Sequence, residues 1–223
     1  MTDSQLRELE RRFRASGSAE DEAAWLRARV QAGELERSSL ELAAYLGSEA
    51  AREFLGPSAP RHTLAPKTGV LGFVRKGLAF WGPLPCLRAA IAATRMVISD
   101  SDDLPEEVGR IRVHLAEEYA VDPRDDILQR LRAQPRTPLP QNERWQTQWW
   151  ICTRCAWALS AQEDPGNLFT WKAKDAVEEV TKAVGSESPV RAAITAELIP
   201  WALGYRDPVR ERVEARQRGA AAE

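Results

Sequence analysis

The sequence predicts an all-α protein, a multi-helix bundle or short helical array around a buried Trp-rich helix, with a smaller N-terminal helical domain. Apolar residues recur at the three- and four-residue spacing of helices, and no stretch shows the sustained alternation of a strand. Capping residues, glycines and prolines fall where these helices would begin and end. Residues 145–161 hold four of the eight tryptophans and, as a helix, would be apolar on most of their circumference, which is typical of a helix surrounded by others.

The first 56 residues are predicted to form a small domain of four short helices. Ser18 with Asp21, and Ser38 with Glu41, have the spacing of capping boxes, which would open the second and third helices. Each helix is followed by a glycine, a residue that readily ends a helix: Gly17, Gly33, Gly47 and Gly56.

Residues 57–85 are predicted to be a linker followed by a basic aromatic segment. The part up to residue 69 is rich in proline and glycine and has no helical period, which is typical of a linker. The aromatic and basic residues that follow are interleaved along the chain: Phe73, Arg75, Lys76, Phe80 and Trp81.

Residues 86–223 are predicted to form the main helical domain. One buried stripe is expected at Leu87, Ile91, Thr94 and Ile98, and a second at Leu104, Val108, Ile111, Leu115 and Tyr119. An aspartate followed by a proline is a common helix start, and the sequence has this pair at Asp122 and Asp207.

The charge balance disfavours a nucleic-acid-binding protein as a class. The chain has 31 basic and 33 acidic residues, a net charge of −2. The distribution is uneven, because the stretch between Glu53 and Asp100 has six basic residues and no acidic one, whereas residues 100–133 carry ten acids and five arginines. The basic aromatic segment could therefore bind a partner or an anion, or its charges could be neutralised inside the fold by the acidic segment.

The remaining composition favours a cytoplasmic protein. The N-terminus is charged and lacks the apolar core of a signal peptide, and no window is apolar and long enough for a membrane-spanning helix. Three cysteines without regular spacing do not make a disulfide framework, so a reducing compartment is expected.

Patterns that could carry chemistry are few. Cys152 and Cys155 form a CxxC, which could serve redox or zinc chemistry, but its place in an apolar helix favours core packing. His114 with Glu117 has the spacing of a reversed metal-binding pair, with no second helix to complete it. Glycines 69, 72 and 77 lack the ending of a phosphate loop. We therefore predict no catalytic or metal-binding residues and no cofactor.

Two resemblances to known families can be traced. Residues 6–47, LRELERRFRASGSAEDEAAWLRARVQAGELERSSLELAAYLG, resemble a small helical module at the N-termini of uncharacterised bacterial proteins. RAAIAATR, PRDDILQRLRAQ and the Trp-rich helix resemble all-α immunity proteins of polymorphic toxin systems. The first resemblance implies no activity, the second implies a dedicated toxin partner, and neither carries over functional residues.

The sequence thus favours a non-enzymatic protein that binds a protein partner, as an immunity-like or adaptor protein, through Arg75, Lys76, Phe80 and Trp81. The alternatives are an enzyme with a pocket beside the Trp/Cys helix, using Arg154, Cys155 or His114, and weak anion or nucleic-acid binding through residues 61–95. The partner and the oligomeric state are open at this level.

Overall fold

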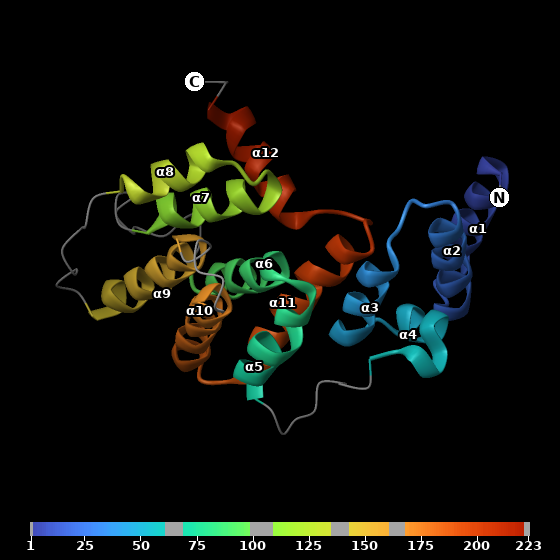
Figure 1. Ribbon diagram of the computed structural model, residues 1–223, viewed down its shortest axis with the longest axis horizontal. Coiled ribbons are helices and arrows are strands. Elements are labelled where there is room, and N and C mark those ends of the chain that lie inside the picture. Colours follow the sequence, from blue (N-terminus) through green and yellow to red (C-terminus); the bar gives the residue numbers. More distant parts are fainter. Residues whose placement is uncertain (1, 61–68, 99–108, 135–142, 161–167, 221–223) are drawn as a thin grey trace. The chain divides into compact units, whose positions relative to one another are not determined.

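The computed structural model describes residues 2–60, 69–98, 109–134, 143–160 and 168–220 (Figure 1). Within these ranges the chain forms helices and no strand, which confirms the predicted all-α class. The helices are α1 (Asp3–Ser16), α2 (Ala19–Gln31), α3 (Arg37–Leu46), α4 (Glu49–Leu55), α5 (Gly69–Gly72), α6 (Pro83–Arg95), α7 (Arg110–Val121), α8 (Asp125–Arg132), α9 (Glu143–Ser160), α10 (Leu168–Val184), α11 (Glu187–Ala202) and α12 (Pro208–Ala220). Most of the predicted linker, residues 61–68, lies outside the described residues.

The chain divides into two compact units. The first comprises residues 1–66 together with 198–206, and the second comprises residues 67–197 together with 207–223. Helix α11 therefore belongs to the second unit as far as Glu197 and to the first from Leu198 onwards. The predicted domain boundaries at residues 56 and 85 stay a prediction.

Of the two helix caps predicted in the first unit at Ser18 and Ser38, the structure has the one at Ser18. The Ser18 side chain accepts a hydrogen bond from the Asp21 amide at 3.1 Å and opens α2, as predicted. Ser38 does not cap α3, because the helix begins earlier, at Arg37, with Glu36 in the capping position. The Ser38 hydroxyl instead donates to the Glu36 carboxylate at 3.1 Å.

An aromatic cluster holds the returning segment 198–206 inside the first unit. The Trp25 ring stacks on Phe13, with centroids 5.5 Å apart, and on Tyr205, at 5.3 Å. The Tyr205 hydroxyl donates to Glu22, and Arg29 donates to the backbone carbonyl that precedes Gly204. Gly204 has a positive φ of 65°, and a Cβ there would lie 3.1 Å from the Arg29 guanidinium, so this turn favours glycine.

Helix α6 forms the core of the second unit. Every residue from Pro85 to Thr94 is buried, and α6 packs against α7, α9 and α10 (Figure 1). The predicted buried stripe is confirmed, since Leu87, Ile91, Thr94 and Ile98 are all at most 2% exposed.

The Trp-rich helix α9 also packs against four helices, α6, α7, α8 and α10. Its buried residues include Ile151, Cys152 and Cys155, whereas Trp150 is 38% exposed with the Arg154 guanidinium 5.6 Å from its ring centre. The side chains of Trp145 and Trp157 lie outside the described residues. On the described part, the helix is thus buried on one side and carries an Arg-covered tryptophan on another.

Two sequence predictions in the second unit are wrong. Ile111, placed on the buried stripe of α7, is 37% exposed, whereas Leu115 and Tyr119 of the same stripe are buried as predicted. Helix α8 begins at Asp125 instead of near Asp122, whose backbone is extended, and the Arg124 guanidinium lies 3.2 Å from the Asp122 carboxylate. The predicted stripe residues Leu104 and Val108 lie outside the described residues.

The predicted start of the last helix is confirmed. Asp207 accepts hydrogen bonds from the amides of Val209, at 3.1 Å, and Arg210, at 3.2 Å, and α12 follows from Pro208.

Candidate partner-binding surface

The predicted partner-binding residues lie on a short irregular segment before α6. After α5, the chain makes a π-helical turn, η3 (Phe73–Gly77), and then a 3-10 turn, η4 (Leu78–Trp81). Because neither turn has the 3.6-residue period of an α-helix, inward and outward positions here do not follow helical spacing. This is why periodicity alone could not decide which aromatic residues are buried.

Apolar side chains anchor this segment to the core of the second unit. Phe73, Val74 and Leu78 are buried, η3 packs against α6 and α10, and η4 packs against α6. The Arg191 guanidinium of α11 lies 5.3 Å from the centre of the Phe73 ring. The amide of Val70 donates to the Glu187 carboxylate at 2.8 Å. The segment is therefore fixed by contacts on both sides of its exposed residues.

The outer side of the segment presents four residues, which we call the basic aromatic surface: Arg75, Lys76, Phe80 and Trp81. Arg75 and Lys76 are exposed at the C-terminal end of η3, and Phe80 on η4 is 79% exposed. Trp81 is half-buried and packs edge-on against Phe80, with ring centroids 5.2 Å apart and planes at 78°. The rings of Phe80 and Trp81 thus contact each other on η4, the turn that follows Arg75 and Lys76 on η3.

The basic residues of the acid-free stretch divide between the core and the surface. Arg88 is 2% exposed, forms a bidentate pair with Asp207 at 2.7 and 2.9 Å, and donates to the Ala120 carbonyl at 3.0 Å. Arg95 pairs with Glu117 at 3.0 and 2.8 Å. Neutralisation by the acidic segment 100–133 therefore holds for Arg95, and Arg88 is neutralised by Asp207 instead. Arg75 and Lys76 are exposed.

The alternative enzymatic site on α9 contains two buried thiols and a paired arginine. Cys152 and Cys155 are fully buried, and burial raises the pKa of both thiols, that of Cys155 to about 12. A thiol of that kind is a poor nucleophile and metal ligand at neutral pH, since the thiolate is the reactive form. Arg154 pairs with Asp175 at 3.1 Å. His114 is half-buried on α7.

Metal binding receives no support from the described part of the chain. No group of three or more His, Cys, Asp or Glu side chains gathers there in a geometry that could hold a metal ion. Glu117, considered with His114 as a metal-binding pair, is occupied by Arg95, Arg212 and Arg216.

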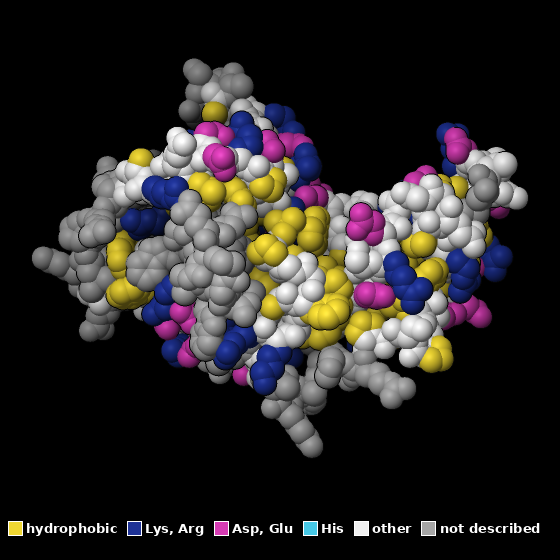
Figure 2. Space-filling model, in the orientation of Figure 1, with side chains coloured by type: hydrophobic (Ala, Val, Ile, Leu, Met, Phe, Trp, Pro, Cys, Tyr) yellow, Lys and Arg dark blue, Asp and Glu magenta, His cyan; other side chains and the backbone are white. Residues whose placement is uncertain are grey.

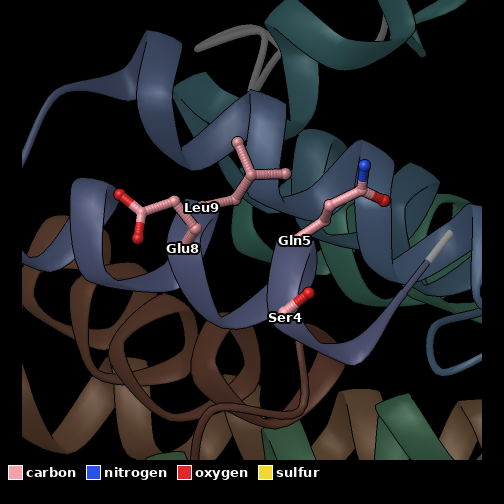
Figure 3. A pocket seen from close by; sticks show the side chains of 4 residues that line it. All are labelled: Ser4, Gln5, Glu8 and Leu9. Atoms are coloured by element: carbon pink, nitrogen blue, oxygen red, sulfur yellow. The ribbon is translucent and has the colours of Figure 1, made fainter.

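Two surface hollows are lined by described residues of the first unit. One, of about 480 Å³, lies along α1 and is lined by Ser4, Gln5, Glu8 and Leu9. Figure 3 shows that Gln5 and Glu8 point in opposite directions, so their polar groups do not converge on a common ligand position. The second, of about 370 Å³, is lined by residues of α1, α2 and α4, among them Arg12, Asp21 and Arg27. Arg12 is paired there with Asp21 at 2.6 Å.

Comparison with protein-family models, curated proteins and solved structures finds no match to this chain. Within the described ranges, no helix has the length and apolar character needed to cross a membrane. On the face drawn in Figure 2, the described basic and acidic side chains are intermixed instead of forming a broad surface of one sign.

Proposed function

We propose that this protein works by binding a protein partner through the basic aromatic surface. One observation carries the proposal: Phe80 is 79% exposed although the residues around it are anchored in the core. Burying a phenylalanine side chain contributes about 1.5–3 kcal/mol, so a partner that covers this ring gains binding free energy of that order.

The surface has the composition of an interaction hot spot. Aromatic residues and arginine are enriched among the few residues that dominate binding energies. Here Arg75 lies on η3, and the contacting pair Phe80 and Trp81 lies on the next turn, η4. Because buried Phe73, Val74 and Leu78 already order the turn, little conformational entropy remains to be lost when a partner binds.

The test compares two variants of the tagged full-length protein, purified from cells that naturally express it, at low and moderate salt. Phe80→Ala removes the exposed ring, and Ile111→Ala trims a 37% exposed apolar residue elsewhere in the same unit. The wild type and the Ile111 variant should retain a stoichiometric partner, identified by mass spectrometry, and the Phe80 variant should lose it. Equal recovery with all three proteins would refute the proposal.

A toxin domain is the first partner class to examine, since part of the sequence resembles immunity proteins. Co-expression with a toxin encoded beside this gene should restore growth of the host cell. Phe80→Ala should abolish that rescue without lowering the amount of folded protein. Growth arrest despite folded wild-type protein would exclude the immunity version and leave other protein partners open.

A further inference from the structure

The first unit is completed by a short segment from the far end of the chain. Residues 198–206 belong to it, whereas all of residues 67–197 belong to the other unit. We infer that helices α1 and α2 form a binding site for a Leu-Gly-Tyr turn, which the chain's own residues 203–205 occupy as a tethered ligand and which a second copy of the chain can supply instead. This site is separate from the basic aromatic surface and does not depend on it.

The site recognises the backbone of the turn through Arg29 of α2. The Arg29 guanidinium donates to the Leu203 carbonyl, and the Arg29 side chain is only 12% exposed. A Cβ on Gly204 would lie 3.1 Å from this guanidinium, and the positive φ of 65° at Gly204 is one that other residues rarely adopt. Glycine is therefore favoured directly after the residue whose carbonyl Arg29 binds.

The site recognises both the ring and the hydroxyl of Tyr205. The ring stacks on Trp25, with centroids 5.3 Å apart, and its centroid lies 6.3 Å from that of Phe13. The hydroxyl donates to the Glu22 carboxylate. A phenylalanine would fill the same place but leave this hydrogen bond unmade, so the site favours tyrosine.

The side chains that form the site contact one another as well as the turn. Trp25 stacks on Phe13 at 5.5 Å, and the Arg29 guanidinium lies 5.1 Å from the centre of the Trp25 ring and 3.7 Å from the Glu34 carboxylate. All four residues belong to the contiguous part of the unit, residues 1–66. A site whose side chains already hold one another loses little conformational entropy when a turn enters it.

A second copy of the chain carries the same turn, so it would make the same contacts residue for residue. The tethered turn is favoured by its effective concentration, which is in the millimolar range for short flexible tethers. Exchange of one element between identical chains is a low-cost route to a dimer. The site should therefore take up the turn of a second copy once the tethered turn is disabled.

The first experiment uses the full-length protein with Gly204→Val and Tyr205→Ala, which disable the tethered turn. A fluorescent peptide of residues 198–206 is titrated with this double variant and with the wild type, and binding is followed by anisotropy. The peptide should bind the double variant at least roughly 10-fold more tightly than the wild type, whose site is occupied. The same peptide with Gly204→Val should bind roughly 10-fold more weakly. Ile111→Ala, a change in the second unit, should behave as the wild type.

A milder variant tests the site without removing the ring. Tyr205→Phe deletes only the hydroxyl, which weakens the tethered turn roughly 3- to 10-fold. The peptide should therefore bind this variant more tightly than the wild type by a similar factor. Circular dichroism checks that each variant is folded.

The second experiment tests the exchange between copies. The double variant, whose site is empty, is mixed with a differently tagged Trp25→Ala variant, whose turn is intact but whose site lacks its stacking ring. These two proteins should co-purify. Ile111→Ala in place of Trp25→Ala should give much less of the complex, because its turn stays in its own site.

Each result decides one part of the inference. No peptide binding by the folded Tyr205→Phe and double variants, or equal binding by the wild type and both variants, would overturn the site. Peptide binding without co-purification of the two complementary variants would refute the exchange with a second copy.

Discussion

Glu117→Gln is the change that best tests the polar core of the second unit. Glu117 is fully buried on α7 and accepts hydrogen bonds from Arg95 at 3.0 and 2.8 Å, from Arg212 at 2.7 Å and from Arg216 at 2.6 Å. Arg212 also pairs with Glu197 of α11 at 2.9 Å. One carboxylate therefore joins α7 to α6 and α12, and removing its charge leaves buried guanidinium groups under-compensated.

The expected loss is large. Removing one member of a buried ion pair typically costs about 3–5 kcal/mol, because the other charge stays in the interior. Glutamine keeps one acceptor oxygen, so we expect the lower end, roughly 3 kcal/mol, or a fall of roughly 6–12 °C in the melting temperature of a unit of this size. Urea titration followed by circular dichroism measures the loss of unfolding free energy.

The neighbouring residue supplies the control. Glu118 lies next to Glu117 on α7 but pairs with Arg130 at the surface, where the arginine is 54% exposed. Glu118→Gln should cost less than about 1 kcal/mol, as exposed ion pairs do. If the two variants lose similar stability, the reasoning about the buried network is refuted.

The same carboxylate predicts a pH dependence. Burial pushes the pKa of Glu117 upward, but the hydrogen bond and charge of Arg95, with the charges of Arg212 and Arg216, outweigh it and hold the pKa below its ordinary value of 4.5. The contribution is therefore fully present above about pH 4.5 and is lost as the pH falls through the lower folded-state pKa. Glu117→Gln should flatten this acid limb of the stability curve, and an unchanged limb would contradict the assignment.

Three further predictions follow from the exposed ring, the aromatic cluster and the thiols. Phe80→Ala should change the unfolding free energy by less than about 0.5 kcal/mol in urea titration, since the ring is exposed, and a larger loss would show that it packs in the fold. Tyr205→Phe removes the hydroxyl that bonds Glu22 and should cost about 1 kcal/mol and accelerate hydrogen exchange in α2. Cys152 and Cys155, being fully buried, should react with a thiol reagent at pH 8 only after unfolding, and rapid labelling of the native protein would contradict their place in the core.

The parts of the fold that the sequence could predict are those with local causes. The Leu87 and Ile91 stripe follows from helical periodicity, and the caps at Ser18 and Asp207 follow from side chains that bond amides two or three residues ahead. In each case the interacting groups are neighbours in sequence, so the pattern contains the whole interaction.

The features that could not be predicted from the sequence depend on residues far apart in the chain. A buried glutamate cannot be expected from the α7 sequence, because Arg212 and Arg216, which stabilise Glu117, come from about a hundred residues later. The same holds for Tyr205, whose hydroxyl meets Glu22 across a separation of 183 residues. At the candidate surface, an unbroken helical period would place Phe73 and Phe80 on the same face, whereas the π-helical and 3-10 turns leave Phe73 buried and Phe80 exposed.

The basic residues between Glu53 and Asp100 serve both the fold and the surface. Arg88 and Arg95 pair with acids inside the unit. The planar guanidinium of Arg88 satisfies the Asp207 carboxylate and the Ala120 carbonyl at once, a geometry that a lysine cannot reproduce. Asp207 directly precedes α12, and Glu117, the acid of Arg95, lies on α7, so both arginines join separate parts of the fold. Arg75 and Lys76 come from the same acid-free stretch, but they are exposed on the segment that also presents Phe80.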